Sequence, residues 1–374
     1  MTNPVRYHLG KFPPTKLDSR ALMPFVGRAN AALGRYDGLL SAIPNASVLL
    51  SPLTTQEAVL SSKIEGTNVT MGEVLELAAG GEPANMTQPK RDDVEEILNY
   101  RVALNVCAQE LAERPISQHM VRQAHALLMQ GVRGREKSPG SYRTDQNWIG
   151  AAGCSMEQAG FVPIAPEHLA SGLQAWEAYM NGDTELDVLV QLAIVHVEFE
   201  ALHPFNDGNG RLGRMLIPLF LYQRKLLNSP NFYMSAYLEA HRDAYLENLR
   251  AVSRDGAWTT WVVFFLQGVI EQASENERKA REILSLYGQV KERIVELTRS
   301  QHAMRALDFL FKNPIFAAPH FVSESQIPRP SALRILGVLK QSRMLHPLRQ
   351  GRGRRAGIYA FRELLNVAEG KRVL

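Results

Sequence analysis

The sequence contains only two cysteines, Cys107 and Cys154, in a chain of 374 residues. They lie far apart, and neither belongs to a Cys-x-x-Cys or Cys/His ligand pattern, which argues against a disulfide framework and a zinc ribbon. The first residues have no apolar core of signal-peptide length, and no apolar run approaches the roughly 18 residues of a membrane span. We therefore expect a reduced, cytoplasmic protein that does not contact a membrane.

A strong charge imbalance, internal repeats and low-complexity tracts are also absent from the sequence. The formal net charge is only +4, and this value does not by itself identify a partner. Hydrophobic residues make up 45% and charged residues 21% of the chain, as in an ordinary globular protein, so a disordered or fibrous chain is not expected. Because a domain usually holds about 100–200 residues, the length predicts two or three compact units.

A helix is predicted from Ser51 to Glu65. Ser51 is a capping residue, Pro52 fits the first helical position, and Gly66 is a typical C-terminal signal. Ser61 and Glu65 are four residues apart and therefore share one face of this helix. A solvated helix end is one explanation for an acidic residue in the last turn. The other is a cationic partner elsewhere in the chain, because Glu65 in this place opposes the helix dipole.

The stretch 131–166 is rich in glycine, proline and turn-forming residues and has no helical period. We expect a β-hairpin between Gln146 and Pro163. Loops of this length in compact domains usually act as lids or binding loops. Trp148 and Phe161 need a surface on which to pack, which argues against a disordered excursion.

Residues 304–374 have the pattern of a helix, a turn, a second helix and a two-stranded wing. From Gln341 to Leu374 there are eight Lys or Arg and two acidic residues, a net charge of +6. A basic wing behind a helix-turn-helix is typical of nucleic-acid binding, here of DNA through residues 322–361. The alternative is a helix-turn-helix that serves only packing or dimerisation, with a solvated arginine turn.

The richest group of chemically active residues is the stretch from His203 to Arg214, His-Pro-Phe-Asn-Asp-Gly-Asn-Gly-Arg-Leu-Gly-Arg. Gly208, Asn209 and Gly210 can turn successive backbone N–H groups inward. The helix that begins directly after them adds its positive end. The stretch therefore predicts an anion nest for phosphate.

Four side chains of this stretch suit a nucleotide-phosphate site. Arg211 and Arg214 are three residues apart on the helix, so both can address phosphate oxygens with their guanidinium groups. Asp207 can hold a Mg²⁺ ion that bridges phosphates. His203 precedes the loop and is placed to take a proton from an attacking hydroxyl.

Other interpretations of this region are weaker. The glycines fit a dinucleotide fingerprint, but the apolar run Leu186–Leu202 is too long for one strand, and no acidic residue follows about twenty positions later. A GxxxxGK[ST] phosphate loop is absent. His196, Glu200 and His203 have the spacing of a metal-binding face. Because the HExxH pattern is missing, a structural role of His196 and Glu200 in a helix bundle is favoured.

The stretch His203–Arg214 resembles the signature of Fic domains, His-Pro-Phe-x-x-Gly-Asn-Gly-Arg-x-x-Arg, at every specified position. The pattern Ser61-x-x-x-Glu65-Gly66 is similar to the family's inhibitory helix motif, in the class that carries it upstream of the core. Residues 139–166 resemble the flap hairpin that clamps the target segment. The C-terminal tail resembles the winged helix appended to some bacterial members.

The resemblance covers roughly residues 50–270 and implies an all-α Fic fold with a small β-hairpin flap, plus a C-terminal winged helix-turn-helix. It implies four parts: an N-terminal helical region with the inhibitory helix, the Fic catalytic core, a linker helix and the winged helix-turn-helix. The expected boundaries of these parts are 1–105, 106–273, 274–303 and 304–374.

The resemblance also implies transfer of AMP from ATP to a Tyr, Thr or Ser hydroxyl of a target protein, or of the chain itself, with release of pyrophosphate. His203 would be the base, Asp207 would hold Mg²⁺ and Asn209 would contact the α-phosphate. Arg211 and Arg214 would address the β- and γ-phosphates. The other expected ATP contacts are Gly208, Gly210, Gly160, Phe161 and Tyr245.

Regulation and partners follow from the same resemblance. Relatives that transfer phosphate carry Lys at the position of Gly210, so this chain fits AMP transfer. Glu65 would pair with Arg214 and withhold it from the γ-phosphate, which would make the enzyme auto-inhibited. The target would dock on the flap 139–166. Independently of the resemblance, an apolar all-helical surface leads us to expect a homodimer. Two alternatives remain: removal of AMP at the same site, and a DNA-binding regulator that uses the Fic-like domain as a sensor.

Overall fold

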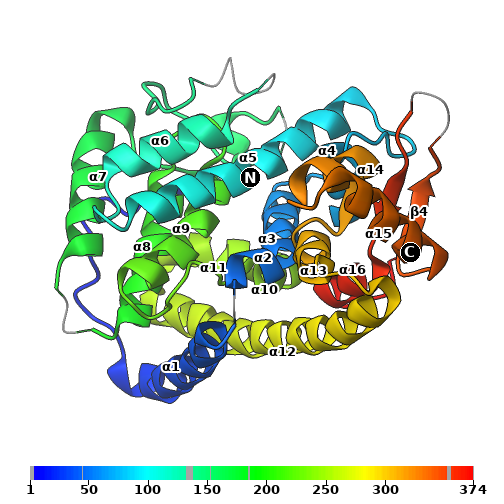
Figure 1. Ribbon diagram of the computed structural model, residues 1–374. Helices are drawn as coiled ribbons and strands as arrows, with labels where there is room; N and C mark the ends of the chain where they lie inside the picture. The colour runs from blue at the N-terminus through cyan, green and yellow to red at the C-terminus, as the bar shows by residue number, and fades with distance from the viewer. Residues whose placement is uncertain are drawn as a thin grey trace. The chain divides into compact units, whose positions relative to one another are not determined.

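The computed structural model describes residues 4–43, 45–131, 138–151, 153–183, 186–351 and 355–373. Helices dominate, and the strands are short (Figure 1). In these ranges no helix combines the length and the apolar character needed to cross a membrane. Two compact units can be distinguished. The first holds Met1–Asp37, Leu60–Gly66 and Asn99–Ser274, and the second holds Gly38–Val59, Thr67–Leu98 and Glu275–Leu374.

The first unit is built around a central buried helix, α8 (Val188–Leu202), in which every residue from Leu189 onward is buried. The Asp187 carboxylate accepts a hydrogen bond from the Leu189 N–H and caps the beginning of the helix. A helix was expected from the apolar run that precedes the glycines, and this expectation is confirmed. Figure 1 shows α8 beside α7 and α9.

The other helices that lie wholly or mainly in the first unit are α1 (Ser19–Ser41), α6 (Gln118–Leu128), α7 (Pro166–Asn181), α9 (Asn209–Gln223), α10 (Ser235–Ala240) and α11 (Arg242–Asp255). Besides α1, whose last residues belong to the second unit, three helices contribute residues to both units: α3 (Ser51–Ile64), α5 (Gln88–Glu110) and α12 (Trp258–Thr298).

A small sheet of the first unit lies at the flap. Strand β1 (Val5–Arg6) pairs in parallel with β2 (Phe161–Val162), and Ile149 forms an antiparallel bridge with Phe161. A single turn of 3₁₀-helix, η2 (Met156–Gln158), lies between the two sides of the hairpin. The hairpin expected from the turn-rich sequence is therefore present in the described residues, although Ala152 lies outside them. The pairing with β1 was not expected.

The second unit contains an antiparallel sheet with the strand order β3-β5-β4. Phe309, Phe316 and Phe321 form its aromatic core, where Phe309 meets each of the other two rings edge-on at a centroid distance of 5.1 Å. The elements of this unit are α2 (Ala46–Leu49), α4 (Met71–Ala78), α13 (Ala303–Lys312), β3 (Ile315–Ala317), α14 (Ala318–Glu324), α15 (Arg329–Gln341), β4 (His346–Arg349), β5 (Ile358–Ala360) and α16 (Arg362–Glu369). Residues 352–354, which belong to the region expected to bind DNA, lie outside the described residues.

Helix α12 continues without a break through residues 272–275, where its composition changes from apolar to charged. No glycine or proline interrupts the chain there, so the backbone hydrogen bonds of the helix continue.

Candidate active site

His203 stands at the C-terminal end of α8, where the chain leaves the helix in a left-handed conformation with φ of 45°. Burial lowers the pKa of the imidazole to about 4, so the ring is neutral at neutral pH. Its Nδ1 atom is buried and has no hydrogen-bond partner among the described residues. A neutral imidazole with a free nitrogen can accept a proton, as a general base must.

The loop between α8 and α9 is closed by the side chain of Asn209. The Phe205 N–H donates to Asn209 Oδ1 at 2.9 Å, and Asn209 Nδ2 donates back to the Phe205 carbonyl at 2.8 Å. The side-chain amide thus shapes the loop from within. The Asn209 side chain, which was expected at the α-phosphate, is thus bonded to the Phe205 backbone, and its own backbone N–H lies in the first turn of α9.

Gly208 suits the backbone conformation of this loop, and Gly210 leaves room for the side chains of Glu65 and Arg214. Gly208 has a φ of 76°, which side-chain-bearing residues rarely adopt, and it directly precedes α9. A Cβ atom on Gly210 would lie 2.2 Å from Glu65 Oε1 and 2.9 Å from Arg214 Nη1. The first turn of α9 therefore presents its N–H groups without covering side chains, which is the arrangement of an anion site.

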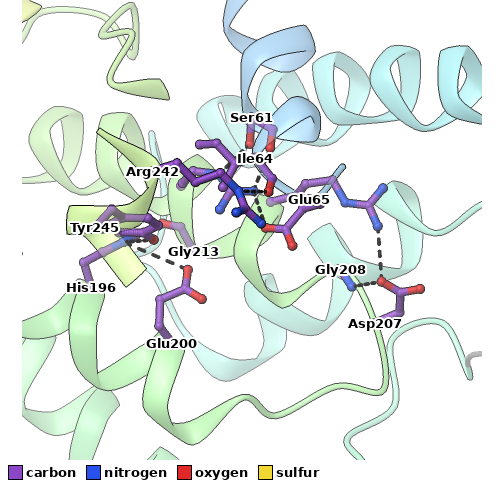
Figure 2. Close-up of polar contacts among 12 residues, drawn as sticks. Ser61, Ile64, Glu65, His196, Glu200, Asp207, Gly208, Gly213, Arg242 and Tyr245 are labelled. Atoms are coloured by element: carbon purple, nitrogen blue, oxygen red, sulfur yellow. Dashed lines mark hydrogen bonds and ion pairs between the residues drawn. The ribbon is translucent and has the colours of Figure 1, made fainter. Parts of the chain in front are cut away.

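Asp207 is joined to the neighbouring backbone and to an arginine. Its Oδ1 accepts from the Gly208 N–H at 2.6 Å and from Arg211 Nη2 at 3.4 Å (Figure 2). The side chain is 47% exposed, so a carboxylate oxygen can still reach a ligand. Among the described residues no group of three or more acidic, histidine or cysteine side chains could hold a metal ion. One carboxylate fits Mg²⁺ that arrives with nucleotide phosphates and keeps several waters.

Arg214 is almost fully buried, with 1% of its side chain exposed, and its guanidinium is hydrogen-bonded to residues at the end of α3. Its Nε donates to Ser61 Oγ at 2.9 Å, and its Nη2 donates to the Ser61 carbonyl at 2.8 Å and to Glu65 Oε1 at 2.7 Å. Figure 2 shows Ser61 and Glu65 close together at the end of α3. The cationic partner expected for Glu65 is thus Arg214.

Opposing effects act on the ionisation of Glu65. Burial raises the pKa of this carboxyl, but the positive charge and hydrogen bond of Arg214 outweigh it, so the net pKa is lowered. The charge of Arg211 acts in the same direction. Glu65 therefore stays ionised at neutral pH, and the ion pair persists there.

The end of α3 is also anchored by residues that the sequence did not suggest. Arg242 Nε donates to the Ile64 carbonyl at 2.9 Å and so satisfies one of the last carbonyls of the helix. Lys63 forms an ion pair with Glu239 at 2.8 Å. An arginine at the beginning of α11 carries no sequence signal that would link it to a carbonyl nearly 180 positions earlier.

A cavity of about 590 Å³ lies in the first unit beside these residues. Its volume falls in the range of small-molecule sites. It is lined by residues of the end of α3 (Ile64, Glu65), the flap (Ile149, Gly150, Gly160, Phe161), α8 and its end (Val197, Glu200, His203), α9 (Gly210, Arg214) and α11 (Tyr245, Leu246, Arg250). Gly160, Phe161 and Tyr245, which were expected at the nucleotide, therefore lie in its wall.

Tyr245 turns its hydroxyl toward the protein interior rather than the cavity. His196 Nδ1 lies 3.2 Å from the Gly213 carbonyl, which can only accept, so this nitrogen carries the proton. His196 Nε2 then accepts from the Tyr245 hydroxyl at 2.9 Å (Figure 2). Burial lowers the pKa of His196 to about 3, and burial raises that of Glu200 to about 7. His196 therefore has a structural role, as the sequence favoured.

Ser61→Ala tests how firmly α3 holds Arg214. The substitution removes the hydroxyl that accepts from Arg214 Nε and leaves the Ser61 carbonyl in place. The loss of about 1 kcal/mol predicts a rise of roughly fivefold in any activity that needs a free Arg214. The measurement is nucleotide incorporation from α-labelled ATP. Ser62→Ala is the matched control, because the buried Ser62 hydroxyl has no hydrogen-bond partner among the described residues, and it should leave incorporation unchanged.

Comparison with known proteins identifies the family. The model of the Fic/DOC family N-terminal region matches residues 23–109, and the model of the Fic/DOC family matches residues 115–221. Together they cover just over half of the chain. The protein therefore belongs to the Fic/DOC family. His203 and Arg214 lie within the Fic/DOC match, and Ser61 and Glu65 lie within the N-terminal match.

Curated relatives carry names that describe an activity. The chain is 28% identical over 202 residues to a probable protein adenylyltransferase of Aquifex aeolicus (strain VF5), which covers 52% of this chain and 56% of that protein. It is also 28% identical over 133 residues to protein adenylyltransferase Fic of Drosophila erecta, covering 35% of this chain and 25% of that protein. The chain thus spans little more than half the length of the first of these relatives, and less of the second.

Solved structures agree with the fold. A Fic family protein from Desulfovibrio desulfuricans G20 matches with a TM-score of 0.59 at 19% identity, over 93% of this chain and 98% of that chain. A Fic domain containing signaling protein from Bacteroides thetaiotaomicron VPI-5482 matches with a TM-score of 0.54 at 18% identity, over 68% of this chain and 97% of that chain. The chain therefore has a mostly helical Fic fold.

Proposed function

We propose that this protein is an auto-inhibited protein adenylyltransferase, which transfers AMP from ATP to a Tyr, Thr or Ser hydroxyl of a target protein or of itself. The observation that carries the proposal is one cavity that brings together a neutral His203, the glycine-lined beginning of α9 and an Arg214 held by Glu65. The names of the relatives, protein adenylyltransferase, support the reaction class.

In the proposed reaction the triphosphate lies on the N–H groups at the beginning of α9, where the helix dipole favours negative charge. Arg211 and Arg214 address its β- and γ-phosphates. His203 accepts the proton of the target hydroxyl at Nδ1, and that oxygen bonds to the α-phosphorus while the bond to pyrophosphate breaks. Asp207 would hold Mg²⁺, which supplies neutralising charge at the phosphates when bound.

In the proposed resting state, Glu65 occupies the guanidinium that the γ-phosphate needs. Arg214 is buried, and its guanidinium cannot bind the γ-phosphate while it is hydrogen-bonded to Ser61 and Glu65. Inhibition is released when the end of α3 moves away. The target would dock on the flap 139–166, whose exposed Trp148 and Ile149 offer an apolar contact. A homodimer in the cytoplasm is part of the same proposal.

The reaction class is tested by intact-mass measurement of the Glu65→Gly protein, alone and with a candidate target, after incubation with ATP and Mg²⁺. A gain of one AMP unit supports adenylylation. A gain of one phosphate unit, or no gain with any target, contradicts it. The same mass measurement tests the competing activity, removal of AMP. A target that already carries AMP would lose one AMP unit when it is incubated with the protein that keeps Glu65.

A second function, DNA binding by a winged helix in the second unit, is favoured by a specific surface. α15 and the turn after it expose basic side chains at Arg329, Lys340 and Arg343, and the basic wing residue Arg355 is also exposed. Replacement of Arg343 and Arg355 by alanine should weaken a gel shift of duplex DNA about equally for all sequences and reduce its salt dependence. If the Arg343→Ala and Arg355→Ala proteins both shift duplex DNA as the unmodified protein does at every salt concentration, this surface does not bind DNA.

A further inference from the structure

Arg143, at the beginning of the flap, is a buried arginine with an unusual set of partners. Its side chain is buried, and every acceptor recorded for its guanidinium in the described part of the chain is a backbone carbonyl. Nε donates to the His203 carbonyl at 2.9 Å, and Nη1 donates to the Asp145 carbonyl at 3.1 Å. Nη2 donates to the carbonyls of Leu202, at 3.3 Å, and of Ile164. Buried arginines usually pair with a carboxylate, so this arrangement calls for an explanation.

Two of these carbonyls belong to the end of α8. The last carbonyls of a helix have no partner within it, and they form the negative end of its dipole. The guanidinium of Arg143 binds those of Leu202 and His203 and so caps the helix with a positive charge. His203 itself has a φ of 45°, a conformation that is uncommon for non-glycine residues. The backbone N–H of Arg143 adds a bond to the Pro204 carbonyl at 2.9 Å.

The other two carbonyls belong to the flap. Asp145 lies just before the hairpin and Ile164 just after it, so one side chain joins both of its ends to the end of α8. Asn147 reinforces the junction, because its Nδ2 donates to the Phe205 carbonyl at 3.1 Å. The position of the flap is thereby fixed relative to His203.

We propose that Arg143 is a positioning residue for AMP transfer, which holds the backbone of His203 and the two ends of the flap in one fixed arrangement. Arg143 does not line the described cavity, so it acts through His203 and the flap rather than through ATP. The inference rests on the proposed function, because it concerns how Arg143 holds the backbone of His203, the proposed base.

The charge of Arg143 also acts on the imidazole. Burial has the largest effect and lowers the pKa of His203, and the Arg143 charge lowers it further. Glu65 from α3, Asp207 from the motif loop and the Glu200 carbonyl act in the opposite direction. Removal of the Arg143 charge should therefore raise the pKa of His203, whereas its replacement by lysine should not.

The experiment compares Arg143→Lys and Arg143→Gln, each in the Glu65→Gly protein, with Arg122→Lys as the matched control. Arg122 also donates to a backbone carbonyl, that of Gly140, at 2.8 Å, but it is exposed. Both Arg143 variants should lower kcat for AMP incorporation roughly 10–100-fold, because small displacements of a catalytic group have effects of this size. KM for ATP should change less than about twofold, and Arg122→Lys should match its parent.

A second readout does not depend on activity. The pKa of His203, followed by NMR of the labelled ring, should rise in the Arg143→Gln protein and stay near the parent value in the Arg143→Lys protein. The positioning role is overturned if Arg143→Lys keeps kcat within twofold of its parent, or if only KM for ATP changes. It is also overturned if the loss of kcat equals the loss of folded protein by circular dichroism. If the Glu65→Gly parent itself transfers no AMP to any target, the proposed function fails, while the NMR comparison still tests the Arg143 contact.

Discussion

Glu65→Gly is expected to raise AMP incorporation from α-labelled ATP by roughly 10–100-fold. The substitution removes the carboxylate that forms an ion pair with Arg214 at 2.7 Å, and it opens space beside Gly210. A hydrogen bond to a charged group contributes about 1.5–3 kcal/mol, which corresponds to this range of rates if release of Arg214 limits the reaction. The measurement is the initial rate of label transfer at saturating ATP, with the chain itself and a candidate target as acceptors.

A glycine in the last turn of α3 would also loosen the helix, and this effect needs its own control. Ser62→Gly places the same flexible residue three positions earlier and keeps the Glu65 carboxylate, and the hydroxyl that it removes has no hydrogen-bond partner among the described residues. It should leave incorporation near that of the unmodified protein. If Ser62→Gly activates as strongly as Glu65→Gly, helix loosening explains the result, and the ion pair is not the restraint.

His203→Ala, made in the Glu65→Gly background, is expected to lower incorporation by 10²–10⁴-fold. This is the usual contribution of a positioned general base, and the buried, neutral ring can perform this role through Nδ1, which has no hydrogen-bond partner in the part of the chain that the structure describes. The measurement is again label transfer, combined with ATP binding by isothermal titration. Binding should be nearly unchanged, because the phosphates are held by α9 and its arginines.

The matched control for His203 is His196→Ala in the same background. His196 is also a buried, neutral histidine of α8, but both of its ring nitrogens are already bonded to protein atoms. The loss of His196 should lower the free energy of unfolding. The protein that remains folded should still transfer AMP at a substantial rate. Persistent transfer in the His203→Ala protein, with folded structure intact, would remove this residue from the role of base.

The parts of the site that could be predicted were those with a local signal. The charge of Glu65 conflicts with the dipole of its own helix, and this conflict pointed to a cation that the structure identifies as Arg214. The apolar run before His203 was long enough to distinguish a buried helix from a strand. Periodicity and helix-end chemistry act over a few residues, so a single sequence records them.

Contacts between distant segments could not be predicted in this way. Arg143 stands in a turn-like stretch, and nothing nearby shows that its partners are carbonyls 2 to 60 positions away. Arg242 and Ile64 are equally remote from one another. Asn209 was interpreted as a ligand of phosphate, whereas its amide is used to close the loop on Phe205. Such roles depend on the three-dimensional arrangement of backbone groups from distant segments, and the local sequence pattern does not reveal this arrangement.

The short parallel pairing of β1 with β2 has a consequence for target choice. Tyr7 donates to Glu198 Oε1 at 2.6 Å and its backbone N–H to the Val162 carbonyl at 3.0 Å, while His8 contacts Glu198 Oε2 at 2.9 Å. One edge of the flap hairpin is therefore already occupied by residues 5–7 of the chain itself. Under the proposed function, a target segment that docks on the flap would have to use the other edge, and residues 5–8 would restrict docking in this way without lining the described cavity.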